Sequence, residues 1–161
     1  MAEHILIAYF TRTGNTREIA QLIQRAVGGV IHELQTQVPY PPSYDAVVDQ
    51  AGQEIKAGFK PALQSTLDQI DSYDTIFVGS PNWWSTIAPP VATFLSQYDW
   101  AGKTIVPFCT HGGGGLARIA QDIARLCPHS TVLSSFAVYE SETKNAQARL
   151  SDWLRQIGMA R

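Results

Sequence analysis

Hydrophobic positions along the chain follow two periods that alternate from one end to the other. Five short runs are rich in β-branched and aromatic residues, which is typical of strands; they cover residues 5–10, 30–34, 75–79, 104–108 and 132–139. The first, third and fourth runs are almost continuously apolar, as expected of strands that are covered on both faces. We therefore expect five short strands, three of them buried on both sides.

Between these runs, apolar residues recur at spacings of three and four, which is the period of an amphipathic helix. We expect helices near residues 19–27, 44–57, 89–95, 116–126 and 150–157. Glycine or proline marks several of their ends. Gly28 and Gly158 follow the first and last helices, Pro89 opens the third, and Pro128 ends the fourth.

Strands that alternate with helices predict an α/β protein, with a parallel sheet and helices on both faces. Right-handed crossovers leave few arrangements of five strands, and the doubly wound order 2-1-3-4-5 is the leading one. The segment 38–74 is longer than one crossover needs, and its prolines suggest ordered loops around a single helix. We therefore expect residues 1–161 to form one doubly wound domain.

Composition narrows the function without identifying it. The 161 residues carry 12 Lys plus Arg against 14 Asp plus Glu, so the formal net charge is -2. This balance argues against binding of nucleic acid, and no apolar run approaches the roughly 20 residues of a membrane span. The first ten residues lack the basic start and the cleavage site of a signal peptide, so we expect a cytoplasmic protein. Two cysteines, Cys109 and Cys127, form neither a disulfide framework nor a zinc site by themselves, and we expect no metal.

The first predicted strand leads into a loop that suits an anion. Three hydroxyls, a glycine and an asparagine stand directly before a helix, in the run Thr11, Arg12, Thr13, Gly14, Asn15 and Thr16. Free backbone N–H groups and the positive end of the helix dipole attract anions, and the hydroxyls add donors. The pattern GxxxxGK[ST] is absent, which favours a phosphomonoester over a triphosphate with magnesium. The alternatives are that Asn15 or Thr16 merely caps the helix, and that Arg12 points to water.

The sequence Thr-x-Thr-Gly-Asn-Thr after the first strand resembles the phosphate loop of flavodoxins. Flavodoxins hold riboflavin 5′-phosphate (FMN) without a covalent link, and their strand order is 2-1-3-4-5. The resemblance extends over nearly the whole chain in element order, length and loop placement, and the loop is its specific part. It implies that FMN is the cofactor and that residues 11–16 bind its phosphate.

The loop after the third strand carries two adjacent tryptophans, which the resemblance places beside the flavin ring. Its candidate residues are Ser80, Pro81, Asn82, Trp83 and Trp84. An indole face stacked on a flat ring adds about 0.5–1.5 kcal/mol beyond burial, and the backbone of this loop can contact the polar edge of the ring. Adjacent side chains point to different sides, so we expect one tryptophan to stack. The alternative is that both belong to the core beneath the loop.

The loop after the fourth strand is rich in glycine and supplies the remaining candidates, Thr110, His111, Gly112, Gly113 and Gly114. Glycines leave N–H groups accessible and let the chain lie along a ring edge. His111 departs from the flavodoxin pattern. It either polarises a flavin carbonyl or donates a proton, or it makes a structural hydrogen bond inside the loop. The alternative for the loop as a whole is a flexible connector without a ligand.

By resemblance, the leading function is electron transfer by a flavin that cycles between oxidised and reduced states. Its partner is then a reductase or acceptor protein, or a small quinone-like acceptor. The alternative is an FMN-dependent enzyme that reduces a quinone with NADH or NADPH. Flavodoxins are markedly acidic, whereas Asp99 is the only acid between residues 75 and 121. We therefore expect the two-electron-reduced flavin to form more easily than in a low-potential carrier.

Two other classes of protein fit less well. A signalling receiver on this fold needs an acidic phosphoacceptor after the third strand, where Gly79 and Ser80 stand. A phosphoesterase needs a cysteine nucleophile or metal-binding carboxylates beside the phosphate loop, and neither accompanies it.

Overall fold

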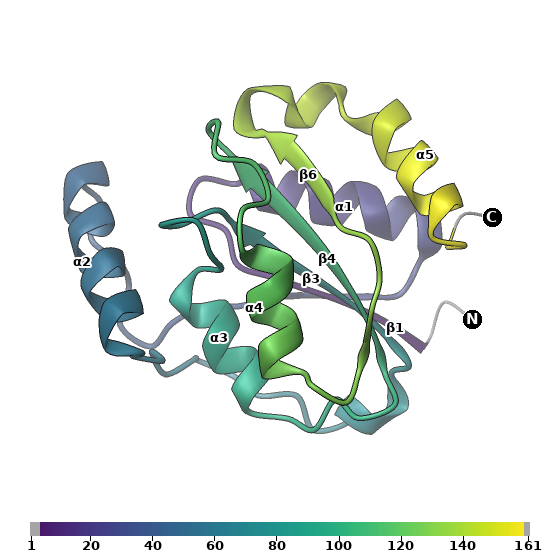
Figure 1. Ribbon diagram of the computed structural model, residues 1–161, viewed down its shortest axis with the longest axis horizontal. Coiled ribbons are helices and arrows are strands. Elements are labelled where there is room, and N and C mark those ends of the chain that lie inside the picture. Colours follow the sequence, from purple (N-terminus) through teal and green to yellow (C-terminus); the bar gives the residue numbers. More distant parts are fainter. Residues whose placement is uncertain (1–3, 160–161) are drawn as a thin grey trace.

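A six-stranded sheet forms the centre of the molecule in the computed structural model, which describes residues 4–159 (Figure 1). Its strands are β1 (Ile5–Tyr9), β2 (Val30–Glu33), β3 (Thr75–Pro81), β4 (Thr104–His111), β5 (Thr131–Val132) and β6 (Phe136–Tyr139). All pairings between these strands are parallel. The order is β2-β1-β3-β4-β5, with β6 also beside β4. The predicted doubly wound order is therefore confirmed.

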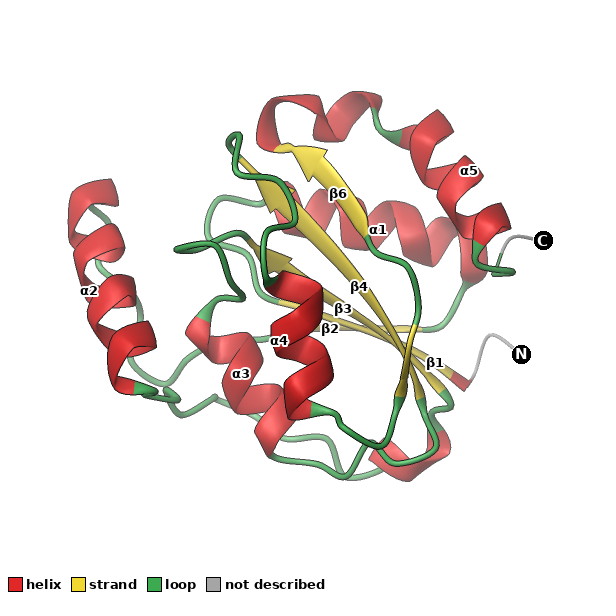
Figure 2. Cartoon of the chain, viewed as in Figure 1, coloured by secondary structure: helices red, strands yellow, loops and turns green. Residues whose placement is uncertain are grey.

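Helices cover both faces of this sheet (Figures 1 and 2). The described chain contains α1 (Asn15–Val27), α2 (Tyr44–Ala57), α3 (Pro89–Ser96), α4 (Ile119–Leu126) and α5 (Gln147–Gln156), with short 3₁₀ helices η2 (Ile70–Ser72) and η3 (Glu140–Asn145). α1 and α5 lie on one face, and α3 and α4 lie on the other. α4 begins later than the predicted residue 116, because Ala117 has a φ of 47° and left-handed backbone cannot continue an α-helix.

The last predicted strand, residues 132–139, is divided in two, so its continuity was predicted wrongly. β5 pairs with the first two residues of β4, whereas β6 pairs with the last four. The interruption contains Ser134 and Ser135, which have no apolar side chain to bury against a helix. The Ser134 carbonyl accepts a hydrogen bond of 2.9 Å from the indole of Trp153 in α5. This contact joins α5 to the gap between the two strands.

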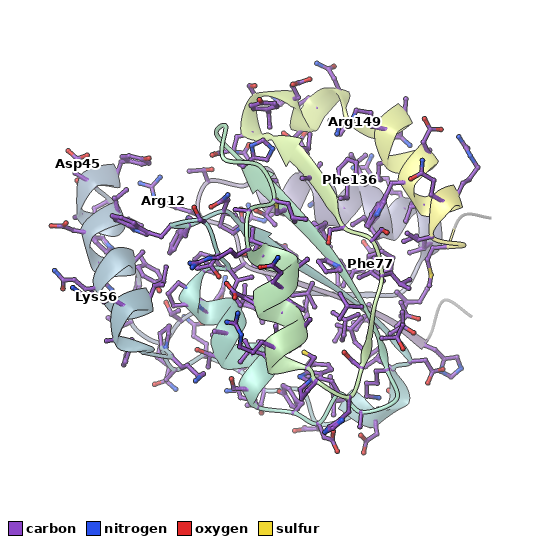
Figure 3. All side chains as sticks on the ribbon, in the orientation of Figure 1. Arg12, Asp45, Lys56, Phe77, Phe136 and Arg149 are labelled. Carbon is purple, nitrogen blue, oxygen red and sulfur yellow. The ribbon has the colours of Figure 1, made fainter. Side chains whose placement is uncertain are left out.

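Two separate cores lie on the two faces, because neighbouring residues of a strand point to opposite sides. Leu6 and Ala8 of β1 belong to the core beneath α3 and α4. Ile7 and Tyr9 belong to the core beneath α1 and α5, together with Phe77 of β3 (Figure 3). Both cores end at the carboxyl edge of the sheet, where the loops after β1, β3 and β4 begin.

A close contact between β3 and β4 fixes the geometry of that edge. Gly79 lies opposite Phe108 in the register, and a Cβ at position 79 would lie 2.3 Å from the Phe108 ring. Real side chains do not approach one another so closely, so position 79 requires glycine. Both strands continue beyond their predicted ends, and Pro81 and Thr110 are paired strand residues, not loop residues.

α2 stands to one side of the sheet and does not cover either face (Figure 1). It buries Val47 and Ala51. Trp84, from the loop after β3, packs against Gly52 so closely that a Cβ there would lie 2.9 Å from the indole. α2 is thereby held beside the carboxyl edge of the sheet. No helix among residues 4–159 is long and apolar enough to cross a membrane.

Candidate functional site

A cavity of about 310 Å³ opens at the carboxyl edge of the sheet. In doubly wound sheets ligands bind at this edge, where the strand order reverses, and the volume is at the lower end of the range of small-molecule sites. Five parts of the chain form its walls: the loop after β1 with the start of α1, the loop after β3, the end of β4, α2, and the start of η3. From the first of these, the lining residues are Thr11, Arg12, Thr13, Asn15 and Thr16.

The loop after β1 contains an internal hydrogen bond and leaves the N-terminal end of α1 without a side-chain cap from the described residues. The Gly14 N–H donates to the Thr11 hydroxyl at 2.9 Å. Gly14 is the N-cap residue of α1 and has a φ of 99°, in the left-handed region that favours glycine. Within the described chain, no side chain caps this helix, so the capping interpretation of Asn15 and Thr16 was wrong. An uncapped helix start presents N–H groups and a partial positive charge to the cavity.

The polar side chains of this loop are connected to distant parts of the chain. The Asn15 amide donates to the Thr13 hydroxyl at 3.1 Å and to the Glu140 carboxylate at 3.0 Å. The hydroxyls of Thr16 and Thr110 are both buried and lie 2.9 Å apart. These contacts hold the loop after β1 against the end of β4 and the start of η3.

The loop after β3 is a tight hairpin with an unusual turn. Trp83 and Thr86 form an antiparallel bridge, and the two residues between them, Trp84 and Ser85, have φ values of 57° and 67°. Positive φ at both central positions is the signature of a type I′ turn, which ordinarily takes Asn-Gly. Asn82 supports the turn, because its carbonyl oxygen accepts from the Ser85 N–H at 2.9 Å.

Asn82 also joins this hairpin to the glycine-rich loop after β4. Its amide group donates to the Gly115 carbonyl at 2.8 Å, and its backbone N–H donates to the Thr110 carbonyl at 2.8 Å. Asn82 therefore holds the hairpin against both the end of β4 and the loop that follows it.

The two tryptophans have different surroundings, although both line the cavity. Trp83 is half-buried and lies edge-on to Phe10 and Tyr40, with ring centroids 5.4 and 5.2 Å away. Trp84 is 55% exposed, and its indole N–H donates to the Val48 carbonyl of α2 at 2.9 Å. Trp83 thus belongs in part to the core, as one of our interpretations proposed, whereas Trp84 joins the hairpin to α2.

α2 supplies a wall that the sequence did not indicate. Tyr44, the first residue of α2, lines the cavity together with Val47, Val48 and Ala51. Arg12 reaches toward this helix (Figure 3): its guanidinium donates to the Pro42 carbonyl at 3.2 Å and lies 5.6 Å from the centre of the Tyr44 ring.

Several predicted residues do not reach the cavity with their side chains. Ser80 is fully buried, and its hydroxyl accepts from the Ala88 N–H at 2.9 Å, where α3 begins. His111 is also buried. Its Nδ1 accepts from the Gly113 N–H at 3.1 Å, and its ring lies 4.5 Å from that of Tyr139. This is the structural hydrogen bond within the loop that one interpretation of His111 proposed.

The glycine-rich loop borders residues that line the cavity but does not itself form part of the lining. Gly112, Gly113 and Gly114 are exposed and are not part of the cavity lining. Gly14 contributes through its backbone conformation.

Thiol and metal chemistry have little basis at this site. Burial raises the pKa of the Cys109 thiol to about 12 and that of the Cys127 thiol to about 11, so both stay protonated at neutral pH. Within residues 4–159, no group of His, Cys, Asp and Glu side chains has a geometry suited to a metal ion.

Glu140 was not identified as a site residue from the sequence, although Glu140 lines the cavity. A single carboxylate of this kind carries no local sequence signal.

Comparisons with known proteins agree with this geometry. The family model for Flavodoxin matches residues 4–157. A protein of Bacteroides eggerthii, provisionally assigned as a flavoprotein, is 27% identical over 96% of this chain and 97% of its own, with a TM-score of 0.84. A similarly assigned protein of Bacteroides uniformis is 26% identical over 96% and 99%, with a TM-score of 0.83.

A flavoprotein of Lactobacillus acidophilus, solved in complex with FMN, shares the fold. It is 22% identical over 89% of this chain and 98% of its own, with a TM-score of 0.71. A comparison with curated proteins found no match.

Proposed function

The chain belongs to the flavodoxin family, and from this premise we propose that it binds FMN non-covalently and transfers electrons through it. The observation that carries the proposal is the uncapped start of α1, which opens into a cavity with two indoles on its wall. When bound, FMN supplies reversible electron transfer. The Lactobacillus acidophilus flavoprotein, which has the same fold, was solved with FMN.

The loop after β1 fits a phosphate in the kind of donors it offers. Thr11, Thr13 and Asn15 present hydroxyl and amide groups to the cavity, and the left-handed Gly14 brings the backbone to the open end of α1. Arg12 adds a positive charge to the same wall. Backbone N–H groups, hydroxyls and a nearby cation are the donors that proteins use for phosphate.

The opposite walls fit a flat, largely apolar ring. Trp83 and Trp84 lie on one side, and Val47, Val48 and Ala51 of α2 lie on another. We propose that the flavin ring is bound between the hairpin and α2, with Trp84 the tryptophan that stacks. Trp84 is more exposed than Trp83 and lies outside the core aromatic cluster, although its indole also contacts Gly52 and Val48 of α2.

We favour an electron carrier, which passes electrons to a redox protein or a small quinone-like acceptor, over an enzyme that oxidises NADH or NADPH. His111 is turned into a hydrogen bond within its own loop, so it is not placed to donate a proton to a substrate in the cavity. The glycine-rich loop after β4 contributes nothing to the lining and offers little for a second substrate pocket.

The visible spectrum of the purified protein tests the cofactor directly. We expect a flavin spectrum and release of FMN on heating, and apoprotein that regains the spectrum when FMN is added. A colourless protein that takes up no FMN in excess would refute the proposal. Turnover of NADH or NADPH with a quinone by the protein alone would favour the enzyme, whereas activity that requires an added reductase supports the carrier.

Thr13→Ala tests the phosphate loop. The Thr13 hydroxyl is exposed and lines the cavity, so its loss should weaken FMN about tenfold, as expected for one hydrogen bond to a charged group. Riboflavin has no phosphate, and its Kd should not change. Thr66→Ala, at an exposed loop position away from the cavity, is the matched control. Equal losses for FMN and riboflavin would show that residues 11–16 do not bind phosphate.

A further inference from the structure

A carboxylate lies in the same cavity as the phosphate loop. Glu140 is the first residue of η3, far along the chain from residues 11–16, and its side chain is part of the cavity lining. One of its oxygens accepts a hydrogen bond of 3.0 Å from the Asn15 amide. A negatively charged group therefore takes up a donor that a bound phosphate would use.

Glu140 is exposed, and the 3₁₀ helix that carries it is tied to α1. The buried Thr143 hydroxyl of η3 donates to Glu18, in the first turn of α1, at 2.8 Å. The second oxygen of Glu140 faces the loop after β4, where a Cβ at Gly112 would lie 3.5 Å from it. η3 is thus tied to the start of α1, with the Glu140 carboxylate between the loops after β1 and β4.

The charge of Glu140 has no paired cation in the described chain, where none of the salt bridges involves it. Arg17, in the first turn of α1, forms two hydrogen bonds of 3.0 Å with Glu33 on the other side of the loop. Arg12 is directed toward Pro42 and Tyr44. The Glu140 carboxylate therefore brings an unpaired negative charge to the cavity, where Arg12 is the other charged residue of the lining.

We propose that Glu140 competes with the phosphate of the ligand and so determines how strongly the site distinguishes phosphorylated from unphosphorylated flavin. The carboxylate accepts the Asn15 amide proton in the free protein and repels a phosphate dianion that approaches the start of α1. This inference rests on the proposed FMN site. If Glu140 has this role, the Kd of FMN is higher than the donors of residues 11–16 alone would give. Bound FMN then exchanges with free flavin.

Glu140→Gln removes the charge and keeps the shape and an oxygen that accepts from Asn15. Like charges about 6 Å apart in a partly exposed site change a binding constant by between about threefold and tenfold after solvent screening. We therefore expect the Kd of FMN to fall by that factor, while the Kd of riboflavin stays the same. The ratio of the two Kd values isolates the effect on the phosphate. High salt should reduce the difference between the variant and the wild type.

Glu142→Gln is the matched control. It makes the same chemical change two residues away on η3, at an exposed side chain that does not line the cavity. Its ratio of Kd values should stay within about twofold of the wild-type ratio. The apoprotein is titrated with FMN and with riboflavin at low ionic strength, and binding is monitored by the quenching of flavin fluorescence. Each comparison of a variant with the wild type then rests on four Kd values, one for each ligand with each protein.

The outcomes separate this inference from the proposed function. Tighter FMN binding in Glu140→Gln, with riboflavin and the control unchanged, supports the role of Glu140. Wild-type protein that binds FMN, together with a variant whose FMN binding is unchanged or weaker, overturns that role and leaves the FMN site standing. Loss of both flavins in the variant would mean that Glu140 supports the ligand, which also contradicts the inference. Wild-type protein that binds no FMN overturns both.

Discussion

Single residues at this site adopt conformations that their side chains do not favour. Trp84 and Ser85 both have positive φ, which costs a non-glycine residue roughly 1–2 kcal/mol. The Asn82 side chain and the indole contact of Trp84 with α2 oppose that cost. Strain of this kind persists where the surroundings determine the conformation, and it concentrates at functional sites.

Ser85→Gly is expected to stabilise the protein. Glycine adopts the left-handed conformation at position 85 without the steric cost, so the free energy of unfolding should rise by about 0.5–1 kcal/mol. Urea unfolding of the apoprotein measures this. Ser65→Gly is the control, because Ser65 is an exposed loop residue without positive φ and should show no gain. A destabilised Ser85→Gly protein would mean that the serine makes contacts that outweigh the strain.

At the scale of elements, α2 and the hairpin after β3 depend on each other. The hairpin carries Trp84, whose indole bonds to Val48 and packs on Gly52. The same helix closes the cavity with its apolar residues. Because α2 lies apart from both cores (Figure 1), we expect its attachment to be weaker than that of the helices on the sheet.

Trp84→Phe should loosen α2 selectively. Phenylalanine keeps an aromatic ring but cannot donate to the Val48 carbonyl, a loss of about 1 kcal/mol. Amide hydrogens of residues 44–57 should then exchange about fivefold faster, as measured by mass spectrometry. Peptides from α1 in the same sample serve as the internal control and should be unchanged. Uniformly faster exchange would indicate global destabilisation instead, and unchanged α2 peptides would show that the indole contact contributes nothing to the attachment.

At the scale of the whole molecule, the charges around the cavity nearly balance. Arg12 and Glu140 are the charged residues in its lining, whereas Asp99 belongs to the turn after α3, where its carboxylate accepts from the Ala101 N–H. Glu140 lies outside residues 75–121, where Asp99 is the only acid. The conclusion that few acids oppose a reduced flavin still stands as a prediction.

Val48→Glu tests this electrostatic argument in FMN-loaded protein. A carboxylate on the α2 wall should lower the potential for forming the anionic reduced flavin, and a unit charge at roughly 8 Å from a flavin would do so by roughly 50–90 mV. Val48→Gln has the same shape without the charge and should shift the potential much less. Equal shifts in the two variants would show that polarity or distortion, not charge, controls the potential. In the wild type, a very low midpoint potential for the second electron would contradict the prediction that the two-electron-reduced flavin forms easily.

The sequence was sufficient for the parts of the fold and site that depend on local patterns. Apolar runs and their spacing predicted the alternation of strands and helices, and the preference for right-handed crossovers and the flavodoxin resemblance then favoured the strand order. The hydroxyl-rich loop before α1 predicted the edge at which the cavity opens. These signals are local because a buried strand or an open helix start is defined by neighbouring residues.

The parts that were missed depend on contacts between distant residues. α2 is recognisable as a helix, but its place beside the cavity follows from the packing of Trp84 on Gly52. Glu140 is a single carboxylate that the fold brings to Asn15. No local pattern encodes either of these contacts.

The interruption between β5 and β6 has a consequence for the behaviour of the protein at high concentration. A long outer strand with unpaired backbone groups invites another copy to add its own strand and begin aggregation. Here that border of the sheet offers one tract of two residues and one of four, with the Trp153 indole bonded at the break between them. An incoming strand would find no continuous template there, so we expect this border of the sheet to resist pairing with another copy.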